Sequence, residues 1–165
     1  MISPDLLRGY PFFGAFDDDG LATVALATEV IECLPGEVLF ESDQPAWALY
    51  VLIAGALELW IVAAERQGTG VRSLYPAGEI STGEVAGISA LVPPHVYTAT
   101  GQITRPSRLL QINAQALRDL SAVAPRLDAA LMHVVAQATM NRLQKARAQL
   151  LATRKPTGPL GVRAM

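Results

Sequence analysis

The residues that could do chemistry are few and stand far apart in the chain. The two histidines, His95 and His133, have no close cluster of acidic residues, so the sequence offers no metal site. Cys33 is the only cysteine, which excludes an internal disulfide, and its place between Glu32 and Leu34 in an apolar stretch indicates a small buried side chain. Fingerprints of serine hydrolases, phosphate loops, zinc proteases and dinucleotide-binding enzymes are all missing. We therefore expect a protein that binds but does not catalyse, with no catalytic residue, no metal and no cofactor.

One short motif, Gly83-Glu84, places a glycine beside a carboxylate shortly after the turn signal Pro76-Ala77-Gly78. Two interpretations of this motif compete. In the first, Gly83 forms a turn and Glu84 is a carboxylate at the start of a short helix, where it complements the helix dipole. In the second, Glu84 is a polar anchor for a small ligand. The motif alone leaves both open.

The elements that must position this motif follow from turn signals and hydrophobic patterns. Residues 3–29 are predicted to be helical with a break in the middle. Residues 30–113 alternate short apolar runs with Gly and Pro turn signals, including Gly68-Thr69-Gly70, which is typical of a sandwich or barrel. Residues 114–152 are predicted to be helical again. The final residues, 153–165, contain two prolines and two glycines and are predicted to be a flexible tail.

Size and composition limit the class of protein. At 165 residues, 51% of them hydrophobic and 17% charged, the chain fits one folded domain over residues 1–152 and excludes a disordered or fibrous protein. The net charge of −2 argues against a general nucleic-acid binder. No acidic residue follows Asp128, whereas six cations do; we interpret them as a solvated, basic helix end. The start of the chain has no apolar core typical of a signal peptide, and we expect a cytoplasmic protein.

The apolar stretch from Ala46 to Ala64 is long enough to cross a membrane. Gly55 interrupts it, Glu58 would lie within the hydrocarbon, and aromatic and β-branched residues dominate it. These features predict strands joined at a bend. No membrane insertion is expected.

The predicted helix that begins at Pro125 carries two stripes. The first stripe is apolar up to Ala138, and its continuation is Arg142 and Lys145, which we interpret as the point where the helix leaves its own domain. The second has heptad spacing and predicts a homodimer, although burial within one chain would also explain it. We call this second stripe the seam; its members are Met132, Ala136, Thr139, Leu143, Ala146 and Leu150.

Several motifs follow one another in an order that resembles the cyclic-nucleotide-binding domain of the catabolite-activator and kinase-regulatory-subunit superfamily. The resemblance covers Leu6 to Leu120 and implies a double-stranded β-helix, or jelly-roll-like β-roll, with N-terminal helices and a long C-terminal helix. The motifs that carry it are Leu6-Leu7-Arg8-Gly9-Tyr10-Pro11-Phe12-Phe13, Leu34-Pro35-Gly36-Glu37-Val38-Leu39-Phe40-Glu41, Leu49-Tyr50-Val51-Leu52-Ile53-Ala54-Gly55, Pro76-Ala77-Gly78-Glu79 with Gly83-Glu84, and Leu109-Leu110-Gln111-Ile112.

The resemblance also implies a ligand site in the phosphate-binding cassette, which here runs from Gly83-Glu84 to the loop that contains His95 and Val96. In the family the glutamate accepts a ribose hydroxyl, backbone amides at a short helix face the cyclic phosphate, and an arginine neutralises its charge. Gly83 and Glu84 match this pattern, but His95 stands where the arginine is expected, and no arginine occurs between Arg72 and Arg105. A neutral imidazole does not replace a permanent cation. The ligand-binding candidates are therefore Gly83, Glu84, His95 and Val96, in a degenerate cassette with weak or no affinity for cyclic AMP.

Two classes of function remain open at this stage. One is a regulatory or ligand-sensing dimer that signals through its long helices to a separate partner protein. The other is an interaction subunit that uses the fold without a small ligand. The helix-turn-helix of DNA-binding relatives does not follow the long helix in this sequence, so we expect no specific DNA binding; a transcription regulator is a distant third.

Overall fold

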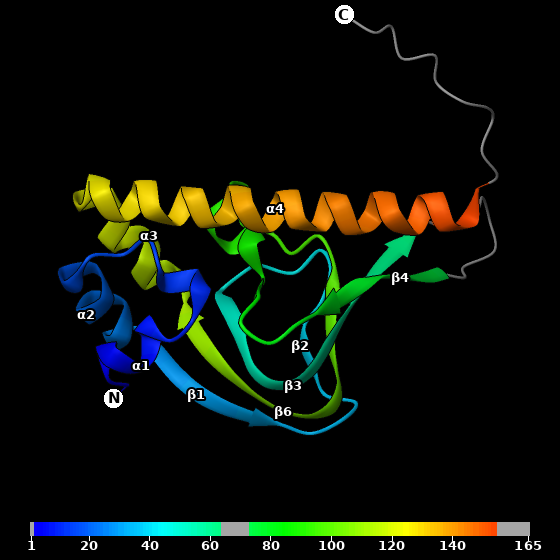
Figure 1. Ribbon diagram of the computed structural model, residues 1–165, viewed down its shortest axis with the longest axis horizontal. Helices are drawn as coiled ribbons and strands as arrows, with labels where there is room; N and C mark the ends of the chain where they lie inside the picture. The colour runs from blue at the N-terminus through cyan, green and yellow to red at the C-terminus, as the bar shows by residue number, and fades with distance from the viewer. Residues whose placement is uncertain (1, 64–72, 155–165) are drawn as a thin grey trace, which may run out of the picture.

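The computed structural model describes residues 2–63 and 73–154. The predicted turn at Gly68-Thr69-Gly70 and the tail from residue 155 onward lie outside the described residues. Within them the strands form one antiparallel sheet in the order β1-β6-β3-β4, in which β2 pairs with β6 and β5 pairs with β3 (Figure 1). This rolled, mostly antiparallel sheet with flanking helices confirms the predicted fold class. The strands are β1 (Thr28–Cys33), β2 (Val38–Phe40), β3 (Ala48–Ala63), β4 (Ser73–Ile80), β5 (Val85–Ala86) and β6 (Thr100–Asn113).

The apolar stretch that could have spanned a membrane forms the central strand, β3, which pairs with β4, β5 and β6. Its bend comes at Gly55, whose φ of +104° suits glycine. A Cβ atom at Gly55 would also collide with Ser107 of β6, and the register of β3 with β6 shifts between Leu52 and Leu57. Among the described residues no helix is long and apolar enough to cross a membrane.

Short helices close one end of the roll, and a long helix crosses it (Figure 1). Local sequence explains their starts: the side chain of Asp17 accepts a hydrogen bond from the amide of Gly20, and that of Asn113 accepts one from the amide of Ala116. Pro125 occupies the first turn of α4, where proline costs no hydrogen bond. The helices are α1 (Pro4–Arg8), η1 (Pro11–Phe13), α2 (Asp18–Leu26), η2 (Ile88–Leu91), α3 (Ala114–Val123) and α4 (Pro125–Thr153).

The core of the roll ties the end of the cassette to the central strand. The ring of Tyr97 stacks on that of Phe40 at 4.6 Å, and Phe40 stacks in turn on Tyr50 at 5.7 Å. The Tyr97 hydroxyl donates to the carbonyl of Ala48 and accepts from its amide. Desolvation raises the pKa of Tyr97, so this hydroxyl stays protonated and keeps both hydrogen bonds. Cys33 is a buried free cysteine, as the apolar stretch around it predicted.

Candidate ligand-binding pocket

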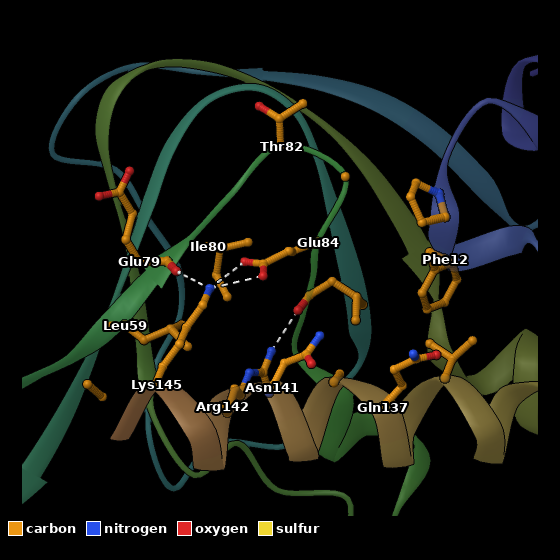
Figure 2. A pocket seen from close by; sticks show the side chains of 17 residues that line it. Phe12, Leu59, Glu79, Ile80, Thr82, Glu84, Gln137, Asn141, Arg142 and Lys145 are labelled. Atoms are coloured by element: carbon orange, nitrogen blue, oxygen red, sulfur yellow. Dashed lines mark hydrogen bonds and ion pairs between the residues drawn. The ribbon is translucent and has the colours of Figure 1, made fainter. Parts of the chain in front are cut away.

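A pocket of about 290 Å³ lies between helix α4 and the segment from Ala77 to Val85 (Figure 2). Apolar side chains from η1, β3, β4 and α4 form its walls. Polar side chains converge on it from the turn before β5 and from the middle of α4. Its lining residues are Pro11, Phe12, Leu59, Ala77, Gly78, Glu79, Ile80, Thr82, Gly83, Glu84, Val85, Val134, Gln137, Ala138, Asn141, Arg142 and Lys145.

Gly83 and Glu84 line this pocket and belong to a tight turn between β4 and β5. The Ser81 amide donates to the Glu84 carboxylate at 2.8 Å, and the Glu84 amide donates back to the Ser81 carbonyl at 2.9 Å. Gly83 has a φ of +85°, which favours glycine, and its amide donates to the Leu52 carbonyl at 2.7 Å. The turn is therefore anchored to β3, and it holds the Glu84 carboxylate towards the pocket (Figure 2).

The Glu84 carboxylate is engaged by Lys145 of α4. The Lys145 ammonium lies 2.9 Å from each carboxylate oxygen and donates to the Glu79 carbonyl at 3.3 Å, which accounts for its three donors. Burial alone would raise the pKa of Glu84, but the Ser81 amide and then Lys145 outweigh it and hold that pKa below its ordinary value. Glu84 therefore stays ionised at neutral pH, and Lys145 takes the acceptor that the resemblance assigns to a ribose hydroxyl.

Arg142, one turn before Lys145, also faces the roll. Its guanidinium donates to the Val85 carbonyl at 2.6 Å. Desolvation lowers the pKa of Arg142 and the Glu84 charge raises it, with a net lowering that leaves the group charged. The interpretation of these two cations as part of a solvated helix end beyond the domain is wrong. The inward stripe of α4 continues past Ala138 and changes from apolar to cationic where it meets the pocket.

His95 and Val96 do not line this pocket. His95 adopts a φ of +58°, its amide donates to the Val92 carbonyl, and its carbonyl accepts from the Ala46 amide. Val96 forms an isolated bridge with Pro45. The structure brings Gly83 and Glu84 together with α4 and leaves His95 and Val96 in the loop packed beside Ala46.

Backbone amides along the cassette are used within the chain. The amides of Ala90, Val92 and His95 donate to the carbonyls of Gly87, Ser89 and Val92, respectively, and the Tyr97 amide donates to the Gln44 carbonyl. These four donors are therefore already engaged within the chain. Within the described part of the chain no group of three or more His, Cys, Asp or Glu residues could hold a metal ion.

The seam lies on a different face of α4, about a third of a turn from these contacts at 100° per residue. Met132, Leu143 and Leu150 are 38%, 42% and 52% exposed, and Thr139 and Ala146 are exposed as well. Burial of the seam within a single chain, the other explanation of its heptad spacing, does not occur. The homodimer that the spacing predicts stays a prediction.

Reasoning from the sequence found Gly83 and Glu84 but missed Arg142, Lys145, Asn141 and Gln137 as lining residues. A signal was present: the first stripe of α4 runs with helical spacing through Val134, Ala138 and on to both cations. Together the lining residues can bind a small molecule through an apolar wall, two amide side chains and fixed charges.

The rolled sheet, the cassette turn at Gly83-Glu84 and the long helix over the pocket define a regulatory or sensor domain of the β-roll type. Residues 30–123 match the family model of the cyclic nucleotide-binding domain, which is more than half of the chain. The chain belongs to this family, whose members are typically regulatory and not catalytic.

Solved structures with the same fold support this assignment. A putative cyclic nucleotide-binding protein from Geobacter metallireducens GS-15 is 32% identical, with 87% of this chain and 99% of that chain covered and a TM-score of 0.74. The N-terminal domain of a transcriptional regulator from Streptomyces coelicolor A3(2) is 26% identical, with 92% and 99% covered and a TM-score of 0.60. The regulatory subunit of a cAMP-independent protein kinase A from Trypanosoma brucei shares the fold, at 15% identity, 88% and 49% coverage and a TM-score of 0.66. No curated protein matches the chain.

Proposed function

We propose that this chain is a non-catalytic regulatory module whose cassette does not recognise cyclic nucleotides and whose long helix signals to a separate partner protein. The observation that carries the proposal is that α4 does two things at once. Its inward side engages the cassette through Arg142 and Lys145, and its outward side presents the exposed seam. A change in the pocket therefore acts on the helix that carries the interaction surface.

Two features of the pocket support the loss of cyclic-nucleotide recognition. Lys145 occupies both oxygens of Glu84, and the cassette carries no arginine to neutralise a phosphate. Loss of one charge-assisted bidentate contact in a mostly buried site costs on the order of 2–5 kcal/mol. The trypanosome relative is described as cAMP-independent, and a triple mutant of it, in which one substitution introduces an arginine, is described as bound to cAMP.

The seam supports a dimer as the signalling unit. Its apolar members repeat with heptad spacing over Met132 to Leu150, and an exposed apolar strip of this kind is usually covered by another helix. A second copy of α4 provides the same pattern around a two-fold axis. We therefore propose a homodimer through the seam, which leaves the rest of the roll surface to a partner protein.

A second candidate function is that of a ligand-free interaction subunit. The Glu84–Lys145 pair favours it, because these two charges of the pocket satisfy each other without a ligand. A transcription regulator is the most distant candidate; its support is that the Streptomyces coelicolor relative is a domain of such a protein.

The dimer dissociation constant tests whether pocket contacts control the seam. Lys145→Gln removes the contact with Glu84 without touching a seam residue, and we expect it to weaken the dimer about five-fold or more in sedimentation equilibrium. Arg126→Gln is the matched control, because Arg126 is exposed in the first turn of α4 and its loss changes the net charge equally. Equal dissociation constants for native protein and Lys145→Gln would refute the proposed signalling route.

A further inference from the structure

Among the described residues, Arg142 is the charged side chain of the pocket lining that has no ion-pair partner. Lys145 is paired with Glu84 at 2.9 Å, and the carboxylate of Glu79 is paired with Arg105 at 3.8 Å. Among the described residues no carboxylate oxygen lies within 4.0 Å of the Arg142 guanidinium. One cation of the lining therefore has no counter-ion in direct contact.

Arg142 is also underused as a hydrogen-bond donor. A guanidinium has five N–H donors, and the structure assigns one of its nitrogens to a protein acceptor, the Val85 carbonyl. Desolvation is the largest influence on the pKa of Arg142, and the charge of Glu84, which is not in direct contact, offsets it only in part. A desolvated cation without a counter-ion in contact is costly. Both facts favour an anion at this position.

The surroundings of Arg142 limit the shape and polarity of such an anion. Phe12, Leu59, Ile80 and Val134 form an apolar wall, and the amides of Gln137 and Asn141 point into the pocket from α4 (Figure 2). Figure 2 marks no hydrogen bond from either amide to another lining residue. A cavity of about 290 Å³ is at the small end of ligand pockets.

We infer that the pocket takes a small amphipathic carboxylic acid, with its apolar body against Phe12 and Ile80 and its single negative charge on Arg142. A single negative charge balances the one uncompensated cation, and a planar carboxylate matches the fork of the guanidinium. The inference rests on the proposed function, because it names the signal that such a regulatory module would bind. It differs from the family's cassette chemistry in that the cation comes from α4.

Two matched pairs of probes test this inference on the native protein: 1-naphthoate against 1-naphthamide, and octanoate against octanamide. Within each pair the body is the same and only the charge differs. In titrations followed by ¹H–¹⁵N NMR, we expect at least one acid to shift the resonances of Ile80, Val85 and Asn141 in a saturable way. We expect its amide to bind ten-fold more weakly or worse. Absence of saturable shifts with both acids, or equal affinity for acid and amide, would overturn the inference.

Substitutions then locate the charge. Arg142→Gln should weaken binding of the acid ten-fold or more, and Arg142→Lys, which keeps a cation without the fork, should weaken it less. Arg126→Gln, the control, should leave affinity within two-fold. Unchanged affinity in a folded Arg142→Gln variant would refute the role of Arg142. Micromolar, Glu84-dependent binding of a cyclic nucleotide would instead refute the proposed function, so the two failures are distinguishable.

Discussion

The ion pair between Glu84 and Lys145 should be measurable as a coupling free energy in unfolding. The perturbation is a double-mutant cycle of Glu84→Gln, Lys145→Gln and the double variant. At 2.9 Å, two unit charges attract by about 1.4 kcal/mol in water, and by more at lower effective dielectric. Ordering the lysine side chain and desolvating both groups offset part of this. Because the side chains of Lys145 and Glu84 are 43% and 32% exposed, respectively, we expect a coupling of about 1 kcal/mol.

Urea unfolding at fixed protein concentration is the assay, since dimerisation would make stability depend on concentration. A control cycle on Glu79 and Arg105, which are 3.8 Å apart and about two-thirds exposed, should give less than about 0.3 kcal/mol. The folded state lowers the pKa of Glu84, so its stabilisation is present above the unfolded pKa of about 4.3 and is lost as pH falls through the lower folded value. A coupling within about 0.2 kcal/mol of zero at pH 7, or one that grows on acidification below pH 4, would refute this account of α4.

Three further predictions concern the seam, the bend in β3 and nucleic acid. Leu143→Glu should place like charges across the two-fold axis, so light scattering should report a dimer for the native chain and a folded monomer for the variant; a native monomer would contradict the seam. Gly55→Ala should destabilise the fold by about 2 kcal/mol or more, because the added methyl group meets Ser107 at a positive φ; a urea midpoint equal to that of the native protein would contradict this packing. Specific duplex DNA binding should be undetectable at about 150 mM salt, and a sequence-dependent gel shift under that condition would count against the interpretation.

More of the fold than of the candidate site could be predicted from the sequence. The turn signals from Pro35-Gly36 to Arg105-Pro106-Ser107 predicted a sandwich or barrel, because each signal acts locally on the backbone. The β-roll itself was implied by the resemblance to the cyclic-nucleotide-binding family. The pocket depends instead on where a helix 29 residues long crosses the roll. Helical spacing gave the angular position of Arg142 and Lys145 on α4 but not the extent of the roll surface beneath them. Their charge therefore suggested solvent, whereas the structure places them against Glu84 and Val85.

The place of His95 in the fold could not be predicted from the sequence. An alignment of motifs places it at the cassette arginine, but the left-handed backbone of His95 and the packing of Tyr97 on Phe40 determine where that loop lies. Neither is visible in a pattern of residue types. The order of the motifs therefore located the loop that contains His95 in the sequence, but it did not predict the orientation of that loop in the fold.

The central claim is that Lys145 of α4 engages the Glu84 carboxylate, which a cyclic nucleotide would need as a hydrogen-bond acceptor. Calorimetric titration of the native protein with cyclic AMP and cyclic GMP tests this claim most directly. We expect no saturable heat at micromolar concentrations of either nucleotide at pH 7. A one-to-one isotherm with a micromolar dissociation constant, abolished by Glu84→Gln, would contradict it, because the Glu84 carboxylate would then be available to ligand despite Lys145.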